Sequence, residues 1–249
     1  AYKASFGFIS ELDKFILHIE NTYFKAADVK LTKYITIPAP FIEEQYLRFN
    51  RYPIRRRFDA MADYMLDMLK IQYTFTVTTT GRNLLKKEIR LTFAGNNDIQ
   101  VYKDFFKWTN NPGMFKMRKG HTLEYSDLAP LAYLHLALEG NGNQPCRVKH
   151  LLIDEMQDYS PIQYKVIQKL FPCRKTVLGD AGQSVNPYGS STAETIQKSL
   201  TASEIMKLCK SYRSTFEITD FAQRFILTQS WNRLPGMEKS HKSCSSAVP

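Results

Sequence analysis

The 249-residue sequence contains no long run of apolar residues. A helix that crosses a bilayer needs about 20 consecutive apolar residues, so the sequence predicts no membrane span. The N-terminus, Ala1-Tyr2-Lys3, also lacks the basic and apolar segments of a secretory signal peptide. We therefore expect a cytoplasmic protein without a membrane partner.

Cysteine and histidine are few and scattered. The four cysteines show no C-x-x-C spacing, and the five histidines form no metal-binding or catalytic-triad pattern. This spacing excludes the usual zinc sites and indicates reduced thiols in a cytosolic protein. The cysteines are Cys146, Cys173, Cys209 and Cys244.

The eleven glycines include no G-x-x-x-x-G-K-[ST] pattern. In proteins that carry this pattern, backbone N–H groups cradle a phosphate chain and the lysine reaches its β- and γ-phosphates. A phosphate-binding loop of this kind is therefore absent from the sequence.

Positive charge is in excess, with a net charge of +10 and a pI near 9.3. Such a balance favours a polyanionic partner, most commonly nucleic acid. In residues 1–95, basic side chains interleave with aromatic ones, as on surfaces that track a nucleic-acid backbone. A solvated helix face is the alternative interpretation. The residues are Arg51, Arg55, Arg56, Arg57, Lys86, Lys87 and Arg90, among Tyr52, Phe58 and Tyr73.

Hydrophobic periodicity predicts a mainly helical first portion. Apolar residues recur at helical spacing over residues 5–24, 54–71, 98–108 and 127–138. Residues 30–37 alternate enough to predict one strand, which Pro38 and Pro40 would end.

Two short apolar runs, 151–153 and 176–178, each end in carboxylates. A helical segment, 161–171, separates them, so the pattern predicts parallel strands of an α/β sheet. Ligands of such sheets bind beyond the carboxyl ends of the strands, where Asp154, Glu155 and Asp180 would gather. Mg²⁺ binds carboxylates together with the phosphate oxygens of a nucleotide. The sequence therefore predicts a magnesium–nucleotide site at this edge of the sheet.

Three motifs in this region resemble those of the UvrD/Rep-like branch of superfamily 1 helicases, most closely the HelD or helicase IV type. Asp-Glu-Met-Gln-Asp at 154–158 resembles motif II, or Walker B; Gly-Asp-Ala-Gly-Gln-Ser at 179–184 resembles motif III; and Ser-Tyr-Arg-Ser at 211–214 resembles motif IV. The resemblance implies an α/β fold: a partial RecA-like P-loop NTPase domain with a parallel sheet, plus a mainly helical insertion subdomain.

The resemblance also implies ATP and Mg²⁺ as cofactors and assigns roles to individual residues. Asp154 would hold Mg²⁺, and Glu155 would orient the attacking water. Gln183 would sense the γ-phosphate, which Arg213 would contact. Nucleotide binding would also involve Asp180 and Tyr212, whose ring would stack on adenine. Tyr188 would stack on a base of single-stranded nucleic acid.

The resemblance divides the chain into three parts. Residues 1–95 correspond to the helical insertion subdomain, a candidate for contact with nucleic acid or a partner. Residues 96–226 correspond to the portion of the RecA-like core that carries motifs II–IV. Residues 227–249 form an irregular tail, for which a frameshift in the coding DNA near Ile226 is a second interpretation.

We expect the chain to be an internal fragment of an ATP-dependent DNA helicase or translocase that acts on single-stranded or tailed duplex DNA. The parent protein would supply the P-loop and the second RecA-like domain, and the fragment alone would be inactive. Two alternatives remain open: a HelD-like ATP-dependent remodelling factor that binds RNA polymerase, and a truncated, non-catalytic nucleic-acid-binding module.

Overall fold

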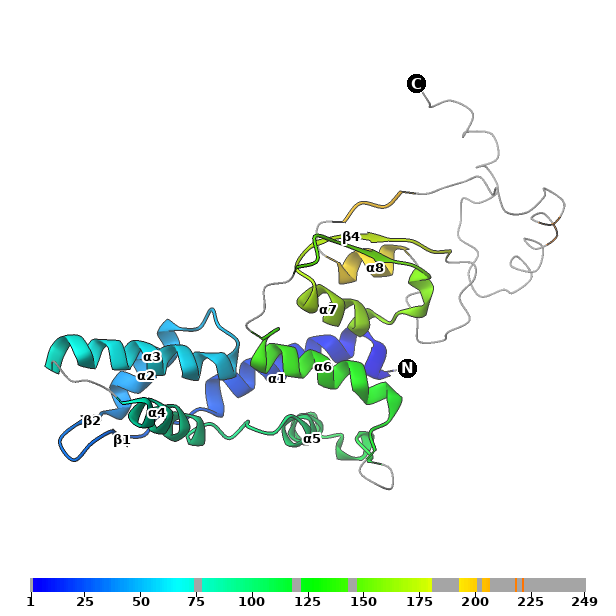
Figure 1. The fold of residues 1–249 in the computed structure, drawn as a ribbon. Coiled ribbons are helices and arrows are strands. Elements are labelled where there is room, and N and C mark those ends of the chain that lie inside the picture. The colour runs from blue at the N-terminus through cyan, green and yellow to red at the C-terminus, as the bar shows by residue number, and fades with distance from the viewer. Residues whose placement is uncertain are drawn as a thin grey trace. The chain divides into compact units, whose positions relative to one another are not determined.

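The computed structural model divides the chain into two units, residues 1–200 and 201–249, and the elements below belong to the first (Figure 1). The residues that the structure describes are 2–73, 78–117, 122–142, 147–180, 193–200, 203–206, 218 and 221.

Six α-helices, which we call the helical body, make up nearly half of the described chain. Three of them begin at a side chain that accepts a hydrogen bond from the first turn: Ser5 from Phe8 N–H, Thr78 from Gly81 N–H and Asn97 from Gln100 N–H. The helices are α1 (Phe6–Thr22), α2 (Ala39–Arg48), α3 (Ile54–Tyr73), α4 (Thr79–Leu91), α5 (Asp98–Trp108) and α6 (Tyr125–Glu139). The four helices predicted from periodicity are confirmed, with ends that differ from the predicted ones by at most two residues.

The core of the helical body is aromatic. Phe58 of α3 packs its ring 5.5 Å from Phe24 and 5.2 Å from Phe93, and Phe8 of α1 packs 5.3 Å from Phe105 of α5. One continuous cluster of buried side chains includes residues of all six helices. This core therefore runs across residue 95, where the sequence predicts a subdomain boundary, and that boundary stays a prediction.

Residues 29–37 form an antiparallel pair of two-residue strands, β1 (Val29–Lys30) and β2 (Thr36–Ile37), so the prediction of one strand over 30–37 is wrong. The physical reason is a local turn. The Thr32 hydroxyl accepts hydrogen bonds from the N–H groups of Tyr34 and Ile35, at 3.2 and 3.1 Å. A threonine that bonds the backbone two and three residues ahead reverses the chain.

The second part of the unit, which we call the sheet region, contains two parallel strands. β3 (His150–Ile153) pairs with β4 (Arg174–Val177) in the register Ile153 to Val177, which confirms the predicted parallel pairing. The chain passes from β3 through a 3₁₀ turn, η3 (Met156–Asp158), and α7 (Pro161–Leu170) to β4, and later forms α8 (Ala193–Ser199).

The helices α7 and α8 lie on one face of this sheet (Figure 1). Ile153 of β3, Tyr164 of α7 and Ile196 of α8 belong to one small buried cluster. Leu152, whose side chain alternates to the other face, is 70% exposed. The described fold is therefore mixed, with many helices and a small parallel sheet.

Helix α7 joins the sheet region to the helical body. Lys169 of α7 lies over the ring of Tyr133 of α6, at 4.9 Å, and the Tyr133 hydroxyl donates to Asp13 of α1 at 2.8 Å. Burial lowers the pKa of Lys169 below its ordinary value. The Asn141 side chain also donates to the carbonyls of Lys169 and Leu170 at the end of α7.

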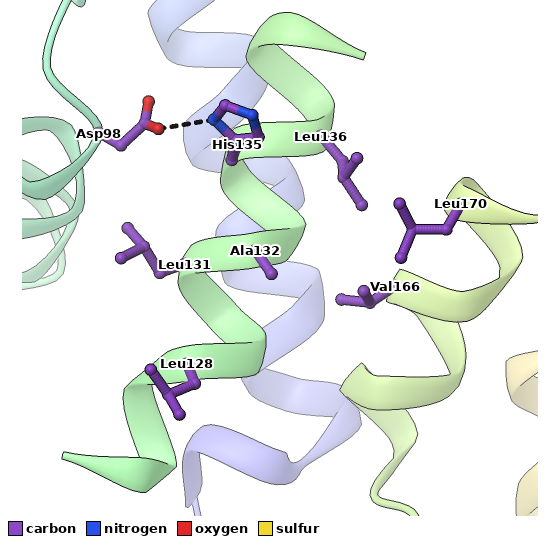
Figure 2. Close-up of a pocket in the computed structure, with 8 residues that line it drawn as sticks. All are labelled: Asp98, Leu128, Leu131, Ala132, His135, Leu136, Val166 and Leu170. Carbon is purple, nitrogen blue, oxygen red and sulfur yellow. Dashed lines mark hydrogen bonds and ion pairs between the residues drawn. The ribbon is translucent and has the colours of Figure 1, made fainter. Parts of the chain in front are cut away.

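A groove of about 400 Å³ lies between α6 and α7 (Figure 2). His135 at its rim approaches Asp98 at 2.7 Å. The groove is lined by Asp98, Leu128, Leu131, Ala132, His135, Leu136, Val166 and Leu170. No helix in the described ranges is long and apolar enough to span a membrane.

Candidate nucleotide site at the strand ends

The carboxyl ends of β3 and β4 meet because the two strands are parallel and in register. Two backbone hydrogen bonds follow the last paired residues of the strands. The carbonyl of Ile153 accepts a hydrogen bond from Leu178 N–H at 2.8 Å, and the carbonyl of Leu178 accepts one from Met156 N–H at 2.9 Å. These bonds continue the pairing past the strands. They bring residues 154–157 beside residues 178–180, as the sequence predicts.

Glu155 lies in a strained backbone conformation, with φ 52° and ψ 54°. This left-handed region costs a non-glycine residue about 1–3 kcal/mol, and residues held there cluster at functional sites. The adjacent Asp154 supports the turn, since its Oδ1 accepts from Glu155 N–H at 2.9 Å. Both acidic residues are exposed, so the turn presents two carboxylates to solvent.

A buried glutamine connects the two strand ends. The Gln157 side-chain amide donates from Nε2 to Glu155 Oε2 at 2.6 Å, and its Oε1 accepts from the backbone N–H of Asp180 at 3.3 Å. Gln157 is only 3% exposed, so its own amide is shielded from water, whereas Glu155 and Asp180 at the other ends of these bonds are exposed. The Glu155 carboxylate and the Asp180 backbone are therefore tied to one side chain.

Gly179 allows this close approach. A Cβ atom at position 179 would lie 2.5 Å from the backbone nitrogen of Met156 and 2.7 Å from Gln157 Oε1. Such distances are far below van der Waals contact, so no larger residue fits here without moving the Glu155 turn.

Helix α7 holds the Glu155 turn from the other side. The Tyr164 hydroxyl donates to the carbonyl of Met156 at 2.8 Å, and burial raises the pKa of Tyr164 above its ordinary value. The helix begins at Ser160, whose N–H and hydroxyl donate to Gln163 Oε1 at 2.8 and 2.9 Å. Pro161 at the first helical position fits the fixed backbone angle of a helix start.

The structure describes three of the seven residues assigned to the site. Asp154, Glu155 and Asp180 lie at the same edge of the sheet, and all three are exposed. The other four, Gln183, Tyr188, Tyr212 and Arg213, lie outside the described residues. The motif resemblance gives no role to Gln157, Gly179 or Tyr164, although Gln157 and Gly179 lie within the segments that resemble motifs II and III.

The basic residues of the first 95 are mostly paired within the helical body. Arg57 lies 2.7 Å from Glu20, and Arg90 lies 2.8 Å from Asp59. Arg55, Arg56 and Lys86 also have acidic partners, and Phe58 is buried. The predicted nucleic-acid contact of this portion is untested, and these pairs leave fewer unneutralised cations to support it.

The comparison with protein families gives a specific match. The model of the UvrD/REP helicase N-terminal domain matches residues 41–203, about two thirds of the chain. The chain belongs to this helicase family. The matched range includes Asp154, Glu155 and Asp180 and ends before Tyr212 and Arg213.

Similar curated proteins are DNA helicases. The chain is 38% identical over 90 residues to DNA helicase II of Haemophilus influenzae, and the aligned region covers 34% of this chain and 12% of that protein. It is 29% identical over 132 residues to ATP-dependent DNA helicase srs2 of Schizosaccharomyces pombe, and the aligned region covers 50% of this chain and 14% of that protein. It is also 29% identical over 127 residues to the putative ATP-dependent DNA helicase YjcD of Bacillus subtilis, and the aligned region covers 47% of this chain and 16% of that protein.

The chain thus spans 12–16% of the length of these three helicases. The UvrD-like family predicted from the motifs is confirmed, and so is a fold that combines helices with a parallel sheet. The HelD type, the full RecA-like architecture and the roles of the individual site residues stay predictions.

Proposed function

We propose that the chain is part of an ATP-dependent DNA helicase and that the carboxyl edge of β3 and β4 contributes to its ATP-hydrolysing site. Membership of the helicase family supports this function. The observation that carries the site is the link from the Glu155 carboxylate through Gln157 to the Asp180 backbone. A coupled pair of strand ends suits a ligand that lies across both.

The donor set at this edge fits Mg²⁺. Mg²⁺ prefers hard oxygen ligands and usually takes one or two protein carboxylates together with phosphate oxygens. Asp154, exposed directly after β3, would hold the ion, which would neutralise charge on the β- and γ-phosphates when bound. Within the described ranges, no group of three acidic, histidine or cysteine side chains could hold a metal alone.

Glu155 would orient the attacking water and accept its proton. Its carboxylate is exposed on one side and fixed on the other by Gln157 Nε2, so one oxygen remains available to a water molecule. A positioned base of this kind accelerates a reaction by about 10²–10⁴-fold. Asp180 and Tyr212 would bind the nucleotide, Gln183 would sense the γ-phosphate, and Arg213 would stabilise the charge that develops on it.

The energy of hydrolysis would drive movement along DNA or separation of its strands. Tyr188 would stack on a single-stranded base, a contact that tolerates any base because each has a flat π-face. In this proposal, residues 1–95 are the helical insertion and residues 96–226 carry the catalytic motifs.

The site is tested by replacing Glu155 in the full-length helicase. We expect Glu155→Gln to reduce DNA-stimulated ATP hydrolysis by about 10²–10⁴-fold while ATP still binds. Glu43→Gln is the matched control, because Glu43 is an exposed glutamate of α2, and we expect it to leave the rate unchanged. Wild-type hydrolysis by Glu155→Gln would contradict the assignment of this edge to catalysis.

The printed 249 residues contain no G-x-x-x-x-G-K-[ST] pattern. Without its lysine and backbone cradle, the β- and γ-phosphates lose their main contacts. We therefore expect these residues alone to show no DNA-stimulated ATP turnover in a phosphate-release assay. Measurable turnover that Glu155→Gln abolishes would contradict this expectation.

A further inference from the structure

Gln157 occupies a position where one buried amide contacts both candidate motifs. Its Nε2 donates to the Glu155 carboxylate, and its Oε1 accepts from Asp180 N–H. A glutamine amide has two donors and one acceptor oxygen, so these two contacts fix both the plane and the direction of the group. Replacing Gln157 would leave the neighbouring polar groups without these partners.

The contacts around Gln157 make its position sensitive to the Glu155 turn and to residues 179–180. Gly179 approaches so closely that a Cβ there would lie 2.7 Å from Gln157 Oε1. On the other side, the Tyr164 hydroxyl holds the Met156 carbonyl, one residue before Gln157. A shift of residues 179–180 would therefore displace the amide, and the amide would displace the Glu155 carboxylate.

We propose that Gln157 is a positioning residue for ATP hydrolysis, holding the Glu155 carboxylate in its working orientation and coupling it to the backbone of the Gly179–Asp180 loop. This inference rests on the proposed function. Gln157 is 3% exposed and acts through Glu155 instead of touching the nucleotide. A hydrogen bond to a charged carboxylate is strong and directional, so its loss affects the orientation of Glu155.

The test is Gln157→Met in the full-length helicase, since methionine keeps the length and flexibility of glutamine without its amide. We expect kcat for ATP hydrolysis to fall about 10–100-fold, as for other residues that orient a catalytic group, while KM for ATP changes less than about twofold. Gln157→Asn is a second variant that keeps an amide but is too short for both contacts, and we expect its kcat to fall as well.

Gln45→Leu is the matched control. Gln45 is also a buried glutamine, 1% exposed, but it belongs to α2 of the helical body and its Oε1 has no hydrogen-bond partner among the described residues. We expect the control to keep the wild-type kcat. A loss of kcat in the control equal to that in Gln157→Met would overturn the inference, because buried glutamines would then act through general packing.

A double-mutant cycle separates positioning from a structural role. In a Glu155→Gln background, Gln157→Met should cause no further loss of kcat, because the group it orients is already removed. Full additivity of the two losses would overturn the inference. If Glu155→Gln alone leaves hydrolysis intact, the proposed function fails; if Glu155→Gln lowers kcat and both Gln157 variants keep it, only the role of Gln157 fails.

Discussion

The helical body and the sheet region are held together in different ways. In the helical body, large aromatic side chains such as Phe8, Phe58 and Phe105 are almost completely buried. Basic residues such as Arg57 and Arg90 pair with nearby acids. In the sheet region the buried cluster is small, and Leu152 is exposed on the uncovered face of the described strands.

Because of this difference, we expect the helical body to determine the stability of the fold and the strand ends to determine the catalytic geometry. Burial of apolar area is non-directional and fixes the helical body through many contacts at once. The strand ends depend on a few directional hydrogen bonds, with Gln157, Tyr164 and the backbone of residue 178 as partners. We therefore expect core substitutions in the helical body to change unfolding, and substitutions near Gln157 to change catalysis.

The largest expected effect on stability is that of Phe58→Ala. Phe58 is fully buried and packs against Phe24, Tyr46 and Phe93, so truncation would leave a cavity in the aromatic core. We expect the free energy of unfolding in urea to fall by about 3–5 kcal/mol. Leu91→Ala, at an exposed position of α4, is the control. A loss below about 1 kcal/mol for Phe58→Ala would contradict the account of the helical body.

Gly179→Ala tests the same contrast in the sheet region. The added methyl group would collide with the Met156 backbone and Gln157 Oε1, so we expect a loss of about 1–3 kcal/mol together with reduced ATP hydrolysis by the full-length helicase. In Gly113→Ala the new Cβ meets no atom of the described residues within 4 Å, and we expect neither effect. Identical behaviour of the two variants would show that the strand ends are less tightly packed than described.

A smaller effect is expected for Tyr102→Phe, in the helical body. The Tyr102 hydroxyl donates to the buried Asp127 carboxylate at 2.9 Å, and Lys3 approaches the same oxygen at 2.6 Å. Because Lys3 remains, we expect removal of the hydroxyl to cost about 1–2 kcal/mol at neutral pH. Tyr34→Phe, at an exposed tyrosine, should cost nothing measurable.

Tyr102 also makes an expected contribution to alkaline unfolding. Burial, reinforced by the charge of Asp127, raises the pKa of Tyr102 above its ordinary value near 10. Above pH 10 the unfolded tyrosine loses its proton while the folded one keeps it, so the stability contributed below pH 10 declines as the pH rises towards the folded pKa. Urea unfolding at pH 7.5 and 10.5 should show a smaller decline for Tyr102→Phe than for wild type; an equal decline would refute this contribution.

The sequence predicts the helices well because their signals are local. Helix α5 begins and ends where periodicity indicates, with Asn97 as its N-cap. The prediction fails at residues 30–37, where the Thr32 turn divides an apparently alternating strand. This error comes from local hydrogen bonds of the Thr32 side chain, which composition does not reveal.

For the candidate site, the sequence predicts which strands end in carboxylates and that the strands are parallel. It does not predict the contact between Gln157 and Asp180, because a side-chain hydrogen bond across 23 residues leaves no periodic signal. The sequence also does not predict the left-handed backbone conformation of Glu155, because glutamate is not a residue that favours that conformation.

The most direct test of the central claim is a crystal structure of the full-length helicase with Mg²⁺ and a non-hydrolysable ATP analogue. We expect Asp154 to lie at the metal, Glu155 to face the γ-phosphate with its other oxygen still bonded to Gln157, and the Gly179–Asp180 loop to border the phosphates. An analogue bound away from the carboxyl ends of β3 and β4, with Glu155 facing solvent, would contradict the central claim.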